Sequence, residues 1–107
     1  MTDPGSTDSL TVSTGGGGVI LARGDIDLAG GPVLEAAILQ QENSEPLVID
    51  VSGVVFIDSS GLRSLLGASR RAGERGTFVV LRSPSPEVRR LLEITGTESQ
   101  FHIEAGE

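Results

Sequence analysis

Short apolar runs rich in β-branched residues alternate along this chain with segments whose apolar residues recur at helical spacing. The runs Leu47 to Val51 and Thr77 to Leu81 are typical of buried strands. Between them, Leu62, Leu65 and Ala72 fall on one helical face. Two parallel strands need a crossing connection, usually a helix, so this alternation predicts parallel strands covered by helices. The pattern therefore restricts the chain to the α/β class.

The remaining elements follow from turn and capping signals. Four glycines between two short apolar runs predict a hairpin turn. Pro32 suits a first helical turn, and Ser85 with Pro86 suits the start of a later helix that ends at Gly96. We predict strands at 10–14, 19–23, 47–51, 77–81 and 101–103, a separate apolar stretch at 54–57, and helices at 32–41, 59–72 and 86–95. The expected fold is a mixed sheet of four to five strands with helices packed on it, in the order β-β-α-β-α-β-α-β.

The length of 107 residues fits one domain. Residues 1–9 are polar and rich in Ser, Thr, Asp, Gly and Pro, so we expect a disordered lead before a single domain at 10–107. We expect the last residues, 104–107, to be frayed.

The charge of the chain excludes several classes of partner. The formal net charge is −7 and every cationic side chain is Arg, which argues against nucleic acid and against an anionic membrane surface. No apolar stretch approaches the ~18 residues needed to span a membrane. The absence of Cys suits the cytoplasm, and the N-terminus shows no signal-peptide pattern.

Few residues could carry catalysis. Without Lys or Cys the chain has no Schiff-base lysine, phosphate-loop lysine or thiolate nucleophile, and no glycine pattern typical of nucleotide binding is present. His102 is the only histidine, and no serine lies in a Gly-x-Ser-x-Gly frame. Asp25 and Asp27 at a strand end suit capping or a partner contact better than acid–base catalysis. We predict no enzyme activity, no catalytic residue, no metal and no cofactor.

The motif Asp58-Ser59-Ser60-Gly61 places two hydroxyls where a buried strand meets a helix. Free N–H groups and a partial positive charge at a helix N-terminus allow a serine to cap the helix or to carry a phosphate. Either Ser59 or Ser60 is simply the capping residue, or one of them is a modification site. Gly61 lacks a side chain, which would let another protein approach the hydroxyl.

Three segments together resemble the STAS domain, named for sulphate transporters and anti-sigma factor antagonists. The segment from Leu47 to Leu62 is similar to its central signature, and Gly24 to Leu28 is similar to its upstream acidic motif. Ser83 to Gly96 resembles its downstream helix. The resemblance covers nearly all of residues 10–103, with the motifs in the family's order.

The resemblance implies an anti-sigma factor antagonist. In that role the unphosphorylated protein binds an anti-sigma factor, which is a serine kinase of the histidine-kinase-like ATPase fold, and so frees a sigma factor. The kinase ends the binding by phosphorylating a serine, and a serine phosphatase reverses the modification. The phosphoacceptor corresponds to Ser60, less well to Ser59, and Asp58 is the acid that positions the hydroxyl. An alternative is a STAS scaffold subunit of a lipid-transport or stress-signalling complex that has no serine switch.

We expect one partner-binding patch, because strand ends and helix starts gather at one edge of an α/β sheet. The expected patch comprises Asp25, Asp27, Asp58, Ser59, Gly61, Leu62 and Arg63.

One departure from the family concerns the first helix. Gly30-Gly31-Pro32 stands there in place of a hydroxyl cap, so we expect a ragged helix start.

Overall fold

The computed structural model describes residues 9–105 and confirms the predicted class and order of elements. The strands are β1 (Thr11–Thr14), β2 (Ile20–Ile26), β3 (Leu47–Ile57), β4 (Val79–Arg82) and β5 (His102–Glu104). The helices are α1 (Gly30–Gln41), α2 (Ser59–Glu74) and α3 (Pro86–Thr95), with 3-10 turns η1 (Gly16–Gly18) and η2 (Glu98–Gln100).

Some terminal predictions fall outside this range. Residues 1–8 of the predicted lead, and residues 106 and 107, lie outside the described residues. The predicted fraying of Glu104 is wrong, because Glu104 pairs with Arg82 at the edge of the sheet. Over residues 9–105, no helix combines the length and the apolar character needed to cross a membrane.

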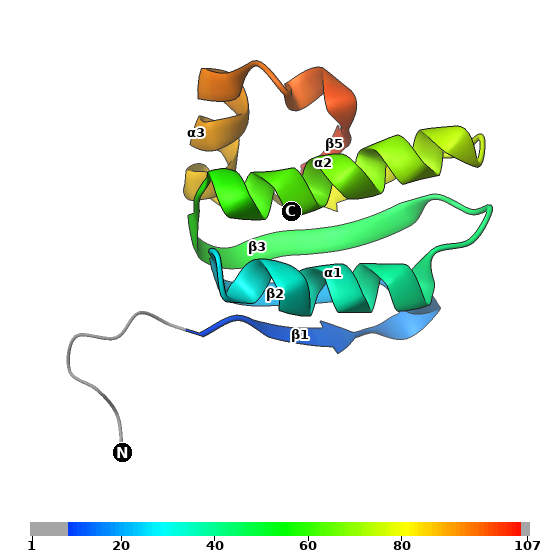
Figure 1. Ribbon diagram of the computed structural model, residues 1–107, viewed down its shortest axis with the longest axis horizontal. Helices are drawn as coiled ribbons and strands as arrows, with labels where there is room; N and C mark the ends of the chain where they lie inside the picture. Colours follow the sequence, from blue (N-terminus) through cyan, green and yellow to red (C-terminus); the bar gives the residue numbers. More distant parts are fainter. Residues whose placement is uncertain (1–8, 106–107) are drawn as a thin grey trace.

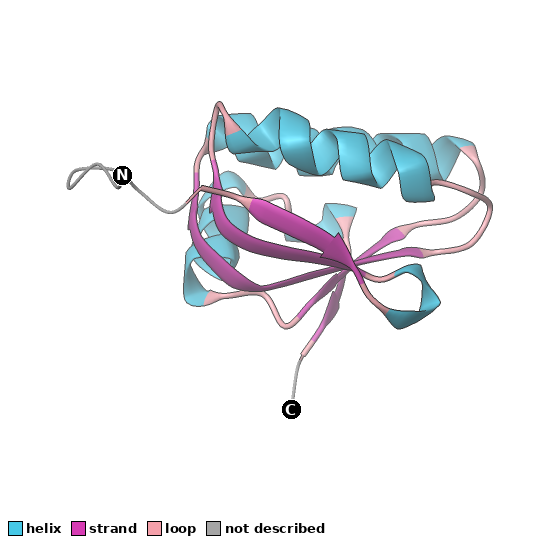
Figure 2. Cartoon of the chain, turned by 90° about the horizontal axis from the view of Figure 1, so that it is seen from below, coloured by secondary structure: helices cyan, strands magenta, loops and turns pink. Residues whose placement is uncertain are grey.

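The five strands form one mixed sheet in the order β1-β2-β3-β4-β5. The predicted glycine hairpin is confirmed, since β1 runs antiparallel to β2 on either side of η1, and the other neighbouring strands are parallel. The two long helices, α1 and α2, lie together on one side of the sheet (Figure 2). In Figure 1 α3 stands at the end of the molecule where β3 runs into α2. Because β2 and β3 are parallel and lead into α1 and α2, the carboxyl ends of these strands and the starts of these helices lie at one edge of the sheet.

The strand β3 is continuous, which corrects the prediction of two apolar stretches separated by Ser52 and Gly53. The parallel pairing with β2 continues through these residues by register shifts. Leu21 pairs with Asp50 and Arg23 with Gly53, so β3 carries an extra residue between the two pairs. A Cβ at Gly53 would lie 2.8 Å from the Cγ of Arg23, so glycine leaves room for that side chain. Long-range pairing thus overrides a local turn signal.

Aliphatic side chains between the sheet and the helices make the core. The predicted helical stripes are confirmed at Leu34, Leu65 and Val88, which are fully buried. The strands contribute Ile20 and Leu81, which are fully buried too. Burial of apolar surface on one side of the sheet holds α1 and α2 in fixed positions above it.

The helix α3 lies beside the part of β3 that has no partner in the short strand β4. Of the residues of β3, only Leu47–Asp50 pair with β4. The next residue, Val51, accepts at its carbonyl from the N–H of Ser85 at 3.3 Å. Both predicted ends of α3 are confirmed: Ser85 Oγ accepts from the N–H of Val88, and Gly96 has a left-handed conformation with φ 68°.

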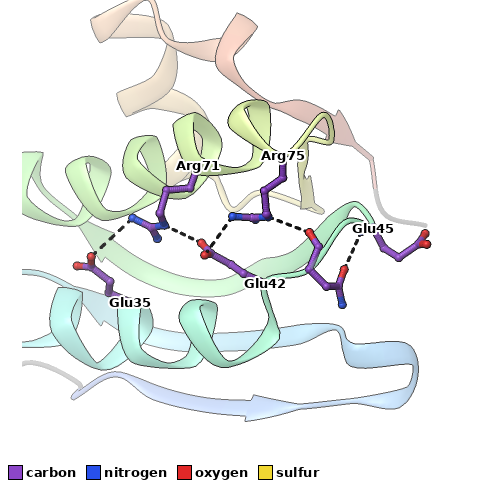
Figure 3. A network of polar contacts seen from close by, with 6 residues as sticks. Glu35, Glu42, Glu45, Arg71 and Arg75 are labelled. Atoms are coloured by element: carbon purple, nitrogen blue, oxygen red, sulfur yellow. Dashed lines mark hydrogen bonds and ion pairs between the residues drawn. The ribbon is translucent and has the colours of Figure 1, made fainter.

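A polar cluster joins α1 and α2 at the ends away from their N-termini (Figure 3). Glu42, just after α1, accepts from Arg71 Nε at 2.8 Å and from Arg75 Nη1 at 3.3 Å. Arg71 Nη1 also lies 3.9 Å from Glu35, and Arg75 Nε donates to the carbonyl of Asn43 at 2.9 Å. These contacts hold the C-terminal parts of the two helices together.

Candidate functional site

The two helix starts are brought together by two neighbouring strands. Ile26 and Ile57, the last residues of β2 and β3, are paired partners in the sheet. The N–H of Asp58 donates to the carbonyl of Ile26 at 3.4 Å, which joins the connection between β3 and α2 to the end of β2. Asp27 and Asp58 therefore leave the sheet side by side, each at the beginning of a helix.

A carboxylate caps each of these helices. Asp58 has an extended conformation, and its Oδ1 accepts from the N–H of Gly61 at 3.1 Å. Asp27 Oδ1 accepts from the N–H of Ala29 at 3.1 Å and of Gly30 at 2.8 Å. These bonds satisfy N–H groups that would otherwise lack partners at the helix start.

The caps correct two expectations. The first helix begins at Gly30, before Pro32, and its N-cap residue Ala29 makes no side-chain cap bond. The Asp27 carboxylate, two residues earlier, accepts from the N–H groups of Ala29 and Gly30, so it holds the helix start in place of a hydroxyl cap. The capping interpretation of Ser59 and Ser60 is wrong, because Asp58 is the cap and both serines lie inside the first turn of α2. Their hydroxyls are therefore not needed to cap the N-terminus of α2.

Gly61 allows close contact between α2 and β2. A Cβ at Gly61 would lie 2.1 Å from the carbonyl oxygen of Ile26, and a Cβ at Gly30 would lie 2.3 Å from the carbonyl oxygen of Asp25. The idea that Gly61 leaves space for a partner is wrong, since the residue is buried against β2. Both glycines place the helix starts directly on the strand end.

A shallow pocket of about 180 Å³ lies between the two helix starts. Ser60 is half-buried and lines this pocket, whereas Ser59 is exposed and is not among its lining residues. A Cβ at Gly31 would lie 3.2 Å from Ser64 Oγ, so the two helices are close at the pocket floor. The lining residues are Asp27, Leu28, Gly31, Pro32, Glu35, Ser60, Arg63 and Ser64.

The pocket contains both signs of charge. Among the described residues that line it, Arg63 is the only cation, and Asp27 and Glu35 are the carboxylates. The Asp27 carboxylate is occupied by the cap of α1, and Glu35 faces Arg71 at 3.9 Å. In the described part of the chain, ion pairs involve Arg71, Arg75 and Arg82, and none involves Arg63.

The predicted patch is divided between surface and interior. Asp25 is only 2% exposed, and its Oδ2 has no hydrogen-bond partner among residues 9–105. Gly61 and Leu62 are buried as well. The other four residues of the predicted patch reach solvent: Asp27, Asp58, Ser59 and Arg63.

Sequence reasoning missed one prominent surface residue. Leu28 is 78% exposed and lines the pocket beside Ser60. A single exposed Leu is common on protein surfaces, so it is the position of Leu28 in the pocket lining, beside Ser60, that makes it a candidate contact residue. The available signal was an apolar residue that follows the Asp25-Ile26-Asp27 motif and precedes the helix.

The chemistry at the pocket is that of an accessible hydroxyl rather than an activated one. His102 lies in β5, stacked on Phe78 with a ring-centroid distance of 4.0 Å, and does not line the pocket. No group of three metal-ligating side chains occurs within residues 9–105. Ser60 therefore presents a hydroxyl at a helix N-terminus, where an added negative charge is tolerated.

Comparison with known proteins gives a consistent result. The model of the STAS domain family matches residues 10–107. The anti-sigma-F factor antagonist RsfB of Mycobacterium tuberculosis (strain H37Rv) is 35% identical over 101 residues, which cover 90% of this chain and 82% of RsfB. The anti-sigma-B factor antagonist of Staphylococcus aureus (strain NCTC 8325) is 25% identical over 85 residues, covering 78% of this chain and 79% of the relative.

A solved structure agrees with this similarity. The crystal structure of an anti-sigma factor antagonist from Mycobacterium paratuberculosis has a TM-score of 0.72 and 32% identity, and the match covers 99% of this chain and 92% of the other. The family model spans nearly the whole chain, including both helix starts that form the pocket. This chain belongs to the STAS domain family.

Proposed function

We propose that this chain is an anti-sigma factor antagonist, a regulatory binding protein rather than an enzyme, and that phosphorylation of Ser60 controls it. The observation that carries the proposal is the position of Ser60, half-buried in a pocket formed by two capped helix starts. The names of the relatives from M. tuberculosis and S. aureus support the antagonist role. The partner is an anti-sigma factor that is also a serine kinase of the histidine-kinase-like ATPase fold, and a serine phosphatase reverses the modification.

The choice of Ser60 over Ser59 rests on the residues that surround each hydroxyl. Both residues lie in the first turn of α2, where a phosphate would face free N–H groups. Only Ser60 lines the pocket, next to Leu28 and Arg63. A kinase that docks on this pocket meets the Ser60 hydroxyl at the centre of its contact.

The proposed docking surface combines an apolar anchor with charged neighbours. Leu28 supplies exposed apolar area, and Asp27, Asp58, Ser59 and Arg63 reach solvent around it. Buried Asp25, Gly61 and Leu62 are left out of the contact surface. They support it from beneath by fixing the two helix starts on β2.

The switch acts at the interface rather than through the fold. A phosphate adds a charge of roughly −1.5 to −2 to a surface that already holds carboxylates. At a helix N-terminus this charge stabilises, so the fold stays intact. Repulsion, bulk and desolvation against a kinase site that holds nucleotide phosphates weaken the complex. We place this cycle in the cytoplasm, where sigma factors act.

The test is phosphorylation by candidate anti-sigma kinases encoded in the same genome. The protein is incubated with each kinase and ATP, and the product is read by intact mass and peptide mapping. We expect one phosphate on Ser60, lost in Ser60→Ala and kept in Ser59→Ala. Ser64→Ala is the matched control, because Ser64 lines the same pocket one turn further along α2.

Two results would contradict parts of the proposal. Phosphate that persists in Ser60→Ala and disappears in Ser59→Ala would move the site to Ser59. Stable binding to a transporter or stress-signalling complex, with no phosphorylation by any of the kinases, would favour a scaffold role.

A further inference from the structure

We infer that Arg63 pairs with the phosphate on Ser60 within the same chain, so that phosphorylation withdraws the cation of the pocket from the partner. The inference rests on the proposed phosphorylation of Ser60. It assigns to Arg63 a role in specificity: one side chain is available to the partner in the unphosphorylated state and engaged internally in the phosphorylated state.

The spacing of the two residues allows this contact. Ser60 and Arg63 are separated by three positions on α2, and such residues have Cβ atoms about 5–6 Å apart on a helix surface. Helical side chains lean toward the N-terminus, so Arg63 leans toward the turn that holds Ser60. Both residues line the same pocket, which places a phosphate on Ser60 within reach of the guanidinium.

The charges around the pocket leave Arg63 available. Asp27 Oδ1 accepts hydrogen bonds from two N–H groups at the start of α1. The Glu35 carboxylate lies 3.9 Å from the guanidinium of Arg71. Arg63 is exposed and is not within 4.0 Å of a carboxylate in the described part of the chain. A phosphate carries more charge than either carboxylate and matches the planar donor pair of Arg. It therefore competes for Arg63 better than the carboxylates already present.

The consequence concerns what the partner meets. In the unphosphorylated protein Arg63 can pair with a carboxylate of the anti-sigma factor. After phosphorylation the guanidinium is neutralised by the adjacent phosphate, and the pocket presents net negative charge from Asp27, Glu35 and the phosphate. Phosphorylation thus removes an attractive contact as well as adding a repulsive one.

The experiment uses the full chain with phosphoserine placed at position 60 by genetic encoding, so that no kinase is needed. Phosphorus NMR follows the phosphate as pH is varied. A neighbouring cation favours the dianion, so Arg63→Ala should raise the midpoint of the phosphate titration by roughly 0.3–0.7 pH units. Arg63→Lys should keep part of the effect, and high salt should shrink it.

Arg70→Ala is the matched control. Arg70 is exposed on the same helix, two turns beyond Arg63 and on the same face, about 10 Å further from Ser60. It should leave the midpoint unchanged. Equal midpoints in the parent, Arg63→Ala and Arg70→Ala proteins at low salt would overturn the inference. That failure is separate from the proposed function, because kinase specificity for Ser60 is measured on the unmodified protein.

Discussion

Gly61 is a residue whose missing side chain determines how the site is built. A Cβ there would lie 2.1 Å from the carbonyl oxygen of Ile26, and backbone of the sheet cannot move away easily. We predict that Gly61→Ala lowers the free energy of unfolding by about 1–3 kcal/mol, the usual cost of overpacking. Urea denaturation followed by circular dichroism measures the change.

Gly73→Ala is the control for this prediction. Gly73 lies in the same helix, and a Cβ there would meet nothing within 4 Å. The added methyl group should leave the free energy of unfolding unchanged or raise it by up to about 1 kcal/mol, because Ala favours helix more than Gly does. Similar losses in the two variants would show that close packing on Ile26 is not the reason for Gly61.

Asp27 has a capping role that can be separated from its charge. Its Oδ1 accepts from two N–H groups at the start of α1. We predict that Asp27→Ala lowers the free energy of unfolding by about 1 kcal/mol. Asp27→Asn should lower it by much less, because the amide oxygen still accepts from the same N–H groups. Denaturation of the three proteins measures this. A loss in Asp27→Asn as large as in Asp27→Ala would contradict the cap assignment.

At the residue level the sequence predicted which segments meet, but not which of their side chains are buried. The Asp58-Ser59-Ser60-Gly61 motif and the acidic motif do meet at one edge of the sheet, as the order of elements predicted. The burial of Asp25 and the packing of Gly61 depend on contacts between segments distant in sequence. Spacing along the chain carries no information on such contacts.

At the scale of elements, the cluster around Glu42 links the far ends of α1 and α2. The Glu42 side chain is 10% exposed and the Arg71 side chain 23%, so both charges are largely withdrawn from water. Glu42→Gln leaves the guanidinium groups of Arg71 and Arg75 without their main counterion. We predict a loss of about 1–3 kcal/mol in the free energy of unfolding, between the values for exposed and buried pairs.

The pair Arg82–Glu104 provides the comparison. Its side chains are 38% and 53% exposed and lie 3.3 Å apart, so solvent screens the interaction. Glu104→Gln should change the free energy of unfolding by less than about 1 kcal/mol. The same denaturation assay serves both variants, and an equal effect in the two would show that burial of the Glu42 cluster does not strengthen it.

The elements themselves were largely predictable, and their limits were less so. The helix α3 was placed correctly because Ser85, Pro86 and Gly96 act locally. The continuity of β3 was missed because Ser52 and Gly53 are turn-forming residues. Their strand conformation comes from pairing with β2. The start of α1 was missed for a similar reason, since its cap comes from Asp27, before the expected start.

At the scale of the whole molecule, the proposed switch leaves the fold unchanged. A phosphate on Ser60 would lie in the first turn of α2, where negative charge is favourable by about 0.3–1 kcal/mol. We predict that the phosphorylated protein melts at the same temperature as the unmodified protein or up to about 8 °C higher. Differential scanning calorimetry of both forms measures this. A large decrease would indicate that phosphorylation disrupts the fold.

Under the proposed switch, phosphorylation of Ser60 controls binding to the anti-sigma factor. The direct measurement is the affinity of the unmodified and Ser60-phosphorylated proteins for the same anti-sigma kinase, by titration calorimetry in one buffer. We predict that the phosphorylated form binds at least roughly a hundredfold more weakly, which corresponds to about 2.7 kcal/mol, and that Ser60→Ala binds like the unmodified protein. Equal affinities of the phosphorylated and unmodified forms would show that Ser60 phosphorylation does not control binding.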